Sequence, residues 1–376
     1  MDVNVPLALL GGLSPAIFMR RHWQKKPLLV RQAWPGVAPP VSRREMFSLA
    51  ASEDVESRLV VHESQRWRVR HGPLPARALP PLSRPGWTLL VQGLDLHRAA
   101  ARVMLERFRF VPDARLDDLM LSWASPGGGV GPHIDSYDVF LLQVQGRRRW
   151  SVGQVADAAF VEGEPLKLLR HFAPQHEWLL EPGDLLYLPP RWGHDGVAEG
   201  GDCMTCSVGF RAPAAQELAR DLLQRLADQD GAEGAEGAIY RDPGQPATAT
   251  PGAVPPRLLA FAQAALARRL ADPQALARAL GESLTEPKPR VWFERGAADG
   301  GHGAVCLDPR SRMMYDERHV YLNGEAYAAA GHDARLMRQL ADARRLTAAE
   351  RARLGAAAAA LLAEWMANGW AHGENA

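Results

Sequence analysis

The chain of 376 residues carries 44 lysines and arginines against 43 acidic residues, so its formal net charge is only +1. This length predicts two or three domains, and the near-zero charge lacks the global basic field that is typical of nucleic-acid-binding proteins. Three cysteines are too few for a disulfide framework, which favours a cytoplasmic protein, and no apolar run approaches the length of a membrane span, so we expect no membrane partner.

The N-terminal region predicts a series of short helices and strands. Ser14-Pro15 is typical of an N-cap followed by proline in the first turn, and it predicts a helix over residues 16–22. Ser42-x-x-Glu45 is a capping box that predicts a second helix to about Ala51. Further along, the apolar patterns predict strands at residues 59–61, 67–70, 87–92 and 116–123 and a helix at residues 97–108.

Residues 125–132, SPGGGVGP, form a predicted loop with four glycines, and His133 follows it at the predicted start of a strand. Residues two apart on a strand point to the same face, so His133 and Asp135 can present an imidazole and a carboxylate to one point. The H-x-D pattern alone is a weak signal, because a chain with 12 histidines and 43 acidic residues can contain it by chance.

A third polar side chain, His194, lies beyond a second apolar strand, and a barrel could fold it back onto His133 and Asp135. Two histidines and one carboxylate on one side of a metal leave open positions opposite. That arrangement suits non-haem Fe(II), which must bind both a co-substrate and O₂. His171 and His176 are rival ligands, but they lie in a polar, loop-like stretch, so we favour His194.

The next segment predicts a hairpin, with a turn at Gln145-Gly146 between strands at residues 138–142 and 147–152. On the second strand, alternation places Arg148 on one face and both Arg147 and Arg149 on the other. An arginine inside a barrel needs an anionic partner, because a buried unpaired charge is very costly. A dicarboxylate co-substrate would supply one. The alternative is a basic surface hairpin, which is our interpretation of Arg147 and Arg149.

Five segments, which begin at residues 23, 131, 146, 180 and 206, carry a further signal: WQKKPLL, GPHIDSYDVF, GRRRWSVG, LEPGDLLYLPPRWGH and CSVGFRAP. Together they resemble the JmjC-type bacterial ribosomal oxygenases. These are Fe(II)- and 2-oxoglutarate-dependent protein hydroxylases of the cupin superfamily. The resemblance is greatest to the arginine hydroxylases that act on a large-subunit ribosomal protein. The tripeptide Arg191-Trp192-Gly193 departs from the family pattern, at the rim of the site.

The resemblance implies an α+β chain built on a double-stranded β-helix barrel of the JmjC/cupin type. It implies that His133, Asp135 and His194 bind the iron. It also implies that Arg148 binds the distal carboxylate of 2-oxoglutarate, with Ser122 as a second contact of this co-substrate.

Four further residues are candidates to contact the substrate. On the strand before the glycine-rich loop, alternation puts Asp118, Met120 and Ser122 on one face. Asp118 could hold a cationic side chain, or it could lie at the solvated start of the strand. Tyr137 would share the face of the iron ligands and could stack on a guanidinium, or it could lie at the rim. Ser207, on a late strand, could also touch the substrate.

We expect three domains, which are a JmjC/cupin catalytic domain at residues 1–213, a helical dimerisation region at residues 214–285 and a winged-helix-like domain at residues 286–376. The predicted helices of the middle region are amphipathic and lie at residues 216–227, 257–270 and 273–281. An isolated helical layer cannot bury its apolar stripes alone. Packing on the barrel or pairing with a second copy would bury them, and the resemblance favours a homodimer.

The last region predicts a small α/β module that resembles the winged-helix domain of the same family. Asn323-Gly324 is typical of a hairpin turn, and residues 332–341 predict a helix. Thr347-x-x-Glu350 is a capping box that predicts one alanine-rich helix ending at Asn368-Gly369. Winged helices often bind DNA. Residues 333–354 hold six arginines against three acidic residues, which is only a modest excess, and these arginines are spread round the predicted helices. We therefore expect no direct nucleic-acid binding.

The sequence therefore predicts an Fe(II)- and 2-oxoglutarate-dependent enzyme that hydroxylates an arginine side chain of a large-subunit ribosomal protein. Three alternatives stay open. The first is a JmjC-type hydroxylase or demethylase of another protein. The second is a metal cupin such as an isomerase, which would not use 2-oxoglutarate. The third is a DNA-binding regulator without enzymatic activity.

Overall fold

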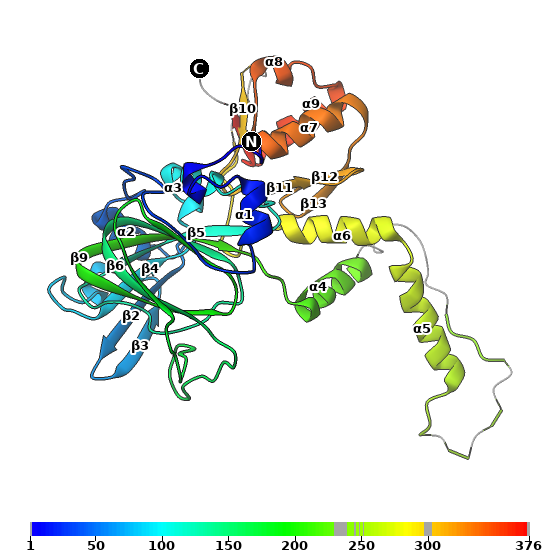
Figure 1. Cartoon of the computed structure of the whole chain (residues 1–376). Helices are drawn as coiled ribbons and strands as arrows, with labels where there is room; N and C mark the ends of the chain where they lie inside the picture. Colours follow the sequence, from blue (N-terminus) through cyan, green and yellow to red (C-terminus); the bar gives the residue numbers. More distant parts are fainter. Residues whose placement is uncertain are drawn as a thin grey trace. The chain divides into compact units, whose positions relative to one another are not determined.

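The computed structural model describes residues 2–228, 239–243, 246–247, 249–250, 252–296 and 303–373. The chain divides into two compact units, Met1–Ala212 and Pro213–Ala376 (Figure 1). None of the helices in the described part of the chain combines the length and the apolarity that are required to cross a bilayer.

The first unit is built on an antiparallel sheet of nine strands, which curves into a barrel (Figure 1). The order of strands is β1-β8-β6-β9-β5-β4-β2-β3, and β7 pairs with β6 beside this path. The bounds are β1 Leu28–Val30, β2 Ser57–Glu63, β3 Arg66–His71, β4 Trp87–Val91, β5 Leu116–Ala124, β6 Val139–Gln154, β7 His176–Leu180, β8 Leu185–Leu188 and β9 Trp192–Phe210. The strands β6 and β9 are the longest and pair along nearly their whole lengths.

The predicted hairpin at Gln145-Gly146 is wrong, because β6 continues through these residues as one strand. The register against β9 shifts on both sides of Gln145. Gly146 has a left-handed φ of 66°, so the extra residue is absorbed as a bulge that bends the strand and does not reverse it. The predicted alternation is confirmed, because Arg148 is buried at 4% exposure and both Arg147 and Arg149 are exposed.

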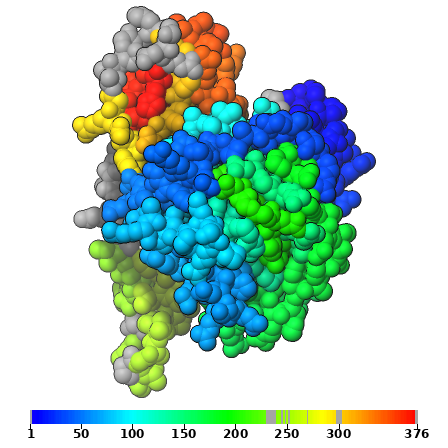
Figure 2. Space-filling model, turned by 90° about the vertical axis from the view of Figure 1, so that its left-hand side faces the viewer, coloured from blue at the N-terminus to red at the C-terminus, as the bar shows by residue number. Residues whose placement is uncertain are grey.

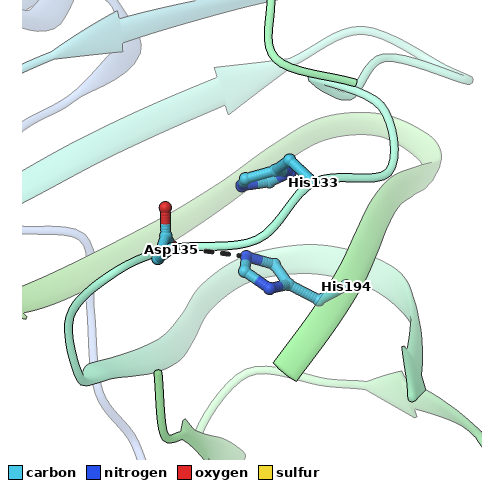
Figure 3. Close-up of side chains that lie close together, drawn as sticks. All are labelled: His133, Asp135 and His194. Carbon is cyan, nitrogen blue, oxygen red and sulfur yellow. Dashed lines mark ion pairs between the residues drawn. The ribbon is translucent and has the colours of Figure 1, made fainter. Parts of the chain in front are cut away.

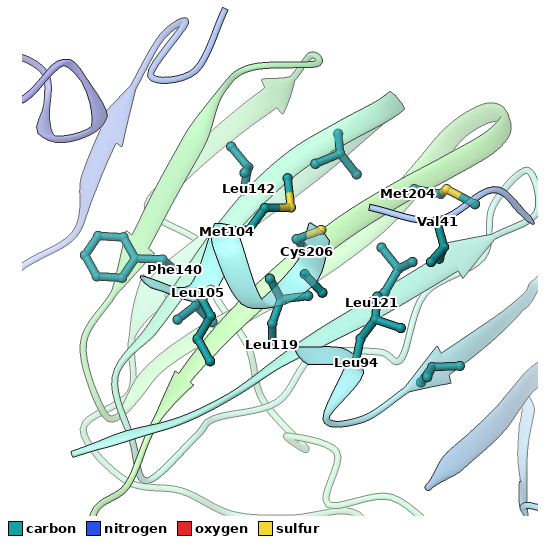
Figure 4. Packing of buried hydrophobic residues seen from close by; sticks show 14 of the residues in the cluster. Val41, Leu94, Met104, Leu105, Leu119, Leu121, Phe140, Leu142, Met204 and Cys206 are labelled. Atoms are coloured by element: carbon teal, nitrogen blue, oxygen red, sulfur yellow. The ribbon is translucent and has the colours of Figure 1, made fainter. Parts of the chain in front are cut away.

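Short helices complete this unit. They are η1 Ala8–Leu10, α1 Pro15–Arg21, α2 Arg43–Ala50, η2 Ala76–Ala78, η3 Leu94–Leu96 and α3 Ala99–Glu106. The predicted N-caps are confirmed: Ser14 Oγ accepts a hydrogen bond from the Ile17 amide, and Ser42 and Glu45 form a reciprocal capping box. Figure 4 shows the core between the sheet and α3, where Leu119 and Leu121 pack among side chains of β6 and β9.

A buried polar network fixes the start of β6. The Tyr187 hydroxyl donates a hydrogen bond to Asp138 Oδ1 at 2.6 Å and accepts one from the Gln24 amide at 2.8 Å. The Gln24 side chain donates to the other carboxylate oxygen of Asp138 at 3.1 Å. Asp138 and Tyr187 are both fully buried, so each needs these partners. The network holds Asp138 three residues beyond the H-x-D motif.

The second unit begins with three helices, α4 Ala215–Asp228, α5 Pro256–Leu270 and α6 Pro273–Thr285. Two small sheets follow, with the strand orders β14-β10-β15 and β11-β12-β13. The remaining bounds are β10 Val305–Leu307, β11 Met313–Tyr315, β12 His319–Leu322, β13 Glu325–Ala328, α7 Gly331–Ala343, β14 Arg345–Leu346, α8 Ala348–Arg351, α9 Ala356–Ala367 and β15 Ala371–Gly373. The predicted Asn323-Gly324 hairpin is confirmed, because these residues join β12 to β13.

The single alanine-rich helix predicted after Thr347 is wrong. The capping box of Thr347 and Glu350 is present, but α8 ends at Arg351 and α9 begins at Ala356. Gly355 interrupts the helix: its backbone is extended, and its amide donates a hydrogen bond to Asp333 Oδ1 at 3.0 Å. A contact with α7 therefore overrides the helix propensity of the intervening residues.

We expect the Tyr187→Phe substitution to lower the free energy of unfolding by about 1–3 kcal/mol, because it leaves the buried Asp138 carboxylate without one of its donors. Urea unfolding of the full chain checks this. The matched control is Ser151→Ala, which removes an exposed hydrogen bond of 3.2 Å to Glu177 on the same sheet and should change stability by less than about 0.5 kcal/mol. Equal effects of the two substitutions would contradict the role given to the network.

Candidate active site

Two reciprocal backbone hydrogen bonds join the H-x-D segment to β9. The His133 amide donates to the His194 carbonyl at 3.0 Å, and the His194 amide donates to the His133 carbonyl at 2.9 Å. The prediction that His133 begins a regular strand is wrong, because this pair is an isolated bridge. The bridge does not extend into a ladder, because the next backbone hydrogen bond is displaced: the Asp135 carbonyl accepts it from the Arg191 amide. Arg191 has a left-handed φ of 65°, which turns the chain at this point.

The bridge places three potential ligands together, as Figure 3 shows. One ligand atom each from His133, Asp135 and His194 lies within 4.8 Å of the others. His194 Nε2 lies 3.6 Å from Asp135 Oδ2, and the two imidazole rings have centroids 4.2 Å apart. Two imidazoles and a carboxylate that converge from one side could hold a first-row divalent metal ion with positions open opposite.

The outer nitrogen of each imidazole is fixed by a backbone carbonyl. His133 Nδ1 lies 2.8 Å from the Gly131 carbonyl oxygen, and His194 Nδ1 lies 3.0 Å from the Trp192 carbonyl oxygen. A proton on each Nδ1 satisfies these bonds and leaves Nε2 with a lone pair for a metal. Burial, followed by the nearby His133, lowers the pKa of His194 to about 4, so the ring is neutral near pH 7 and can act as a ligand.

The rival histidines lie elsewhere. His171 is exposed in the segment before β7, and His176 is the first residue of β7, where its ring stacks on Trp178 with centroids 4.9 Å apart. The expectation that His176 lies in a loop is therefore wrong. Neither residue belongs to the ligand group that the described residues form.

Arg148 is the buried cation of this region. It lies on β6 opposite Ala198 of β9, with its guanidinium carbon 5.8 Å from the centroid of the Trp150 ring. Its Nε and Nη2 atoms are buried and have no hydrogen-bond partner among the described residues. A buried guanidinium with unpaired donors is costly for the fold, so its environment fits an anionic group that the polypeptide itself does not supply.

Asp195 is a half-buried group beside the site that the sequence reasoning missed. Burial raises its pKa, while the positive charges of His133 and Arg148 act in the opposite direction. Its Oδ1 atom is buried without a hydrogen-bond partner among the described residues. Its position directly after His194 is a possible signal, although alternation along a strand places neighbouring side chains on opposite faces.

The candidate substrate residues lie on paired positions of β5 and β9. Met120 is directly opposite Ser207, and Ser122 is opposite Thr205, to whose carbonyl its hydroxyl donates at 3.3 Å. Asp118 is only 2% exposed, so its alternative placement at a solvated strand start is wrong. Its Oδ2 atom accepts hydrogen bonds from the Gly93 amide and the Gln92 side chain, both at 2.9 Å; this anchors the carboxylate.

Gly209 leaves a space between Asp118 and Tyr137. A Cβ atom at Gly209 would lie 3.9 Å from Asp118 Oδ1 and 4.0 Å from Tyr137 Cε2, so the carboxylate and the ring border one position. Burial, then the charge of Asp135 and a hydrogen bond to it, raise the pKa of Tyr137, and Asp118 adds to the effect. Tyr137 is nevertheless 39% exposed, so its ring lies at the rim of the site, between Asp135 and solvent.

Two family models match the chain, a JmjC domain over residues 103–218 and a ROXA-like winged helix over residues 268–372. The chain is 36% identical over 283 residues to a ribosomal protein uL16 3-hydroxylase of Escherichia coli K12, covering 72% of this chain and 71% of that protein. It is 38% identical over 232 residues to a probable ribosomal oxygenase of Haemophilus influenzae, covering 60% of this chain and 57% of that protein.

Solved structures give the same result over nearly the full length. The X-ray structure of Escherichia coli ycfD matches with a TM-score of 0.84 and 30% identity, covering 96% of this chain and 98% of that one. The structure of the same ribosomal oxygenase with cobalt and 2-oxoglutarate matches with a TM-score of 0.79 and 31% identity, covering 96% and 99%. These similarities confirm the predicted JmjC/cupin fold with a C-terminal winged helix.

We expect His194→Ala to weaken the binding of Co(II), used as a stable probe of the metal site, by about a hundredfold or more. Loss of a partner of a metal ligand already costs ten- to a hundredfold, and this substitution removes one of three ligands. Isothermal titration calorimetry at fixed pH measures the effect. His171→Ala and His176→Ala are the matched controls and should change the affinity less than about twofold. Unchanged binding by His194→Ala would remove His194 from the ligand set.

Proposed function

The chain belongs to the JmjC-domain ribosomal oxygenases, and we propose that it hydroxylates an arginine side chain of a large-subunit ribosomal protein. As a member of this family it is a 2-oxoglutarate-dependent dioxygenase that requires a divalent metal. The observation that carries the arginine assignment is the anchored Asp118 carboxylate facing the Tyr137 ring across Gly209. The name of the curated relative, a uL16 hydroxylase, supports a ribosomal protein as substrate.

In this proposal His133, Asp135 and His194 hold Fe(II), and Arg148 with Ser122 holds 2-oxoglutarate. The buried, unpaired Nε and Nη2 atoms of Arg148 match the carboxylate of a dicarboxylic acid, which can accept two hydrogen bonds from one guanidinium. When bound, the metal supplies the oxidising chemistry that couples decarboxylation of 2-oxoglutarate with O₂ to transfer of one oxygen atom to the substrate. The chain itself supplies charge, orientation and exclusion of water around it.

The substrate guanidinium would be recognised by charge and by a planar contact. Asp118 can accept hydrogen bonds from it, because the Gly93 amide and Gln92 hold the carboxylate in place. The Tyr137 ring can stack on the same plane, with Met120 and Ser207 on the paired strands as further contacts. An arginine whose guanidinium is held at these groups would present one of its side-chain methylene carbons, and not a nitrogen, toward the metal.

The domain organisation remains part of the proposal. We assign catalysis to residues 1–213, dimerisation to residues 214–285 and a winged-helix-like, protein-facing role to residues 286–376. Large apolar side chains stay exposed on the three helices of the middle region, and these are Leu223, Leu258, Leu259, Leu266, Leu270 and Leu276. A second copy of the chain would bury them, which supports a homodimer.

We expect Arg148→Ala to raise the 2-oxoglutarate concentration required for half-maximal turnover by roughly ten- to a hundredfold, because a charge-assisted hydrogen bond is worth about 1.5–3 kcal/mol. Steady-state succinate production measures this. The matched control is Arg149→Ala, since Arg149 is exposed and pairs with Glu199 outside the barrel. A larger effect of Arg147→Ala or Arg149→Ala than of Arg148→Ala would refute the assignment of the co-substrate contact.

We expect Asp118→Asn to lower peptide hydroxylation at least tenfold while the requirement for 2-oxoglutarate stays unchanged, because the substitution removes only the charge beside the guanidinium. A peptide whose target arginine is replaced by lysine should fail similarly, since a point charge loses the planar contact with Tyr137. Turnover of each peptide is measured by mass spectrometry. Equal turnover of the lysine peptide, or an added oxygen found only on histidine, would contradict the arginine assignment.

Assembly is tested by light scattering at micromolar concentration, where we expect the mass of a dimer. Leu259→Glu with Leu266→Glu should shift the protein to a monomer, because the two side chains are 55% and 61% exposed and would place charges in the interface. Val103→Glu, at a residue of the catalytic unit that is 57% exposed, is the control and should stay dimeric. A wild-type monomer would remove the dimer proposal and leave the catalytic one standing.

A further inference from the structure

The hairpin of β2 and β3 and the segment that follows it concentrate positive charge. Residues 64–94 contain five arginines, one histidine and no lysine, aspartate or glutamate, within a chain whose total charge is +1. The arginines are Arg66, Arg68, Arg70, Arg77 and Arg84. The net charge of the whole chain conceals this local excess of arginines, and the expectation of no nucleic-acid binding rested on that net charge and on the C-terminal region.

Three of these arginines form a row on the edge strand of the sheet. β3 pairs only with β2, and Arg66, Arg68 and Arg70 alternate along it with the half-buried Trp67 and Val69. The three arginines are exposed and share one face, at intervals of about 7 Å along the strand. Figure 2 shows this part of the catalytic unit, drawn in blue to light blue, open to solvent on the face toward the viewer.

The opposite face of the hairpin is committed to the active-site loop. Trp67 stacks on His62 with ring centroids 4.2 Å apart. A Cβ atom on Gly131, two residues before the first candidate metal ligand, would lie 2.9 Å from the Trp67 ring. One side of β3 therefore supports the loop that carries His133, and the other side presents the row of arginines.

The arginines of the row have no acidic partner within the part of the chain that the structure describes. Arg70 donates one hydrogen bond, at the limiting distance of 3.5 Å, to the Ala78 carbonyl beside Arg77. By contrast, two arginines of this unit outside the row pair with acids, the exposed Arg149 with Glu199 and the half-buried Arg84 with Glu63. Charges on an edge strand also discourage aggregation. Lysine or acidic side chains would give the same protection, so it does not explain why these 31 consecutive residues contain arginine but no lysine, aspartate or glutamate.

We propose that the row of Arg66, Arg68 and Arg70 binds the phosphodiester backbone of RNA. Regular spacing along an extended strand fits a linear polyanion, and the interval is close to the separation of neighbouring phosphates in an extended nucleic-acid strand. Guanidinium groups bind phosphates through two parallel hydrogen bonds, which explains the use of arginine without lysine. Such contacts fix position without reading sequence. Binding itself does not depend on the proposed function, although a ribosomal-protein substrate would give it a use.

The test is fluorescence anisotropy of the full-length protein with a labelled single-stranded uridine 20-mer over a range of salt concentrations. The variant Arg66→Gln/Arg68→Gln/Arg70→Gln should bind at least tenfold more weakly at low salt. It should also reduce the slope of log K against log salt by about 2, because each phosphate contact on a single strand contributes roughly 0.7. Arg68→Gln alone should reduce the slope by about 0.7.

The matched control is Arg20→Gln/Arg21→Gln/Arg44→Gln, which removes the same charge from three exposed arginines of the same unit and should change affinity less than about twofold. Both triple variants should hydroxylate free peptide at the wild-type rate, so failure of the proposed enzymatic function is scored separately from RNA binding. The proposal is overturned if wild-type protein does not bind the RNA, or if both triple variants lose affinity equally. Binding to anionic vesicles or to polyglutamate in the absence of RNA binding would also overturn it.

Discussion

The pair of backbone hydrogen bonds between His133 and His194 is the constraint on which the site depends. It joins residues that are 61 positions apart in the chain, through an isolated bridge between the H-x-D segment and β9. Because both imidazoles start from one bridge, their rings lie 4.2 Å apart before any metal is considered. The carbonyls of Gly131 and Trp192 then fix the outer nitrogens, so the inner nitrogens are preorganised as ligands.

The long pairing of β6 with β9 also fixes the positions of the candidate co-substrate and substrate residues relative to the two histidines. It buries Arg148, whose Nε and Nη2 atoms have no hydrogen-bond partner among the described residues, and this environment fits an anionic ligand. On the other side of β9, pairing with β5 sets Met120 opposite Ser207, and Gly209 keeps open the space between the Asp118 carboxylate and the Tyr137 ring. The candidate metal, co-substrate and substrate residues thus share one sheet register.

The sequence predicted best those features that local contacts decide. The capping box at Ser42 needs only residues three apart, and it was correctly identified. Gly146 was misread as a turn, because only pairing with β9 shows that its left-handed backbone makes a bulge. Gly355 breaks a helix through a hydrogen bond to α7, and Asp118 owes its buried position to Gly93 and Gln92 of another segment. Such long-range contacts leave no local pattern, and the ribosomal substrate was suggested only by family resemblance.

We propose that this chain transfers one oxygen atom to an arginine of a large-subunit ribosomal protein. The most direct measurement is mass spectrometry of unmodified large-subunit proteins after incubation with the enzyme, Fe(II), 2-oxoglutarate and ¹⁸O₂. We expect a single ¹⁸O atom on a methylene carbon of one arginine, with at least one succinate formed for each hydroxyl. An added oxygen on another residue type, or succinate formed with no modified ribosomal protein, would contradict it.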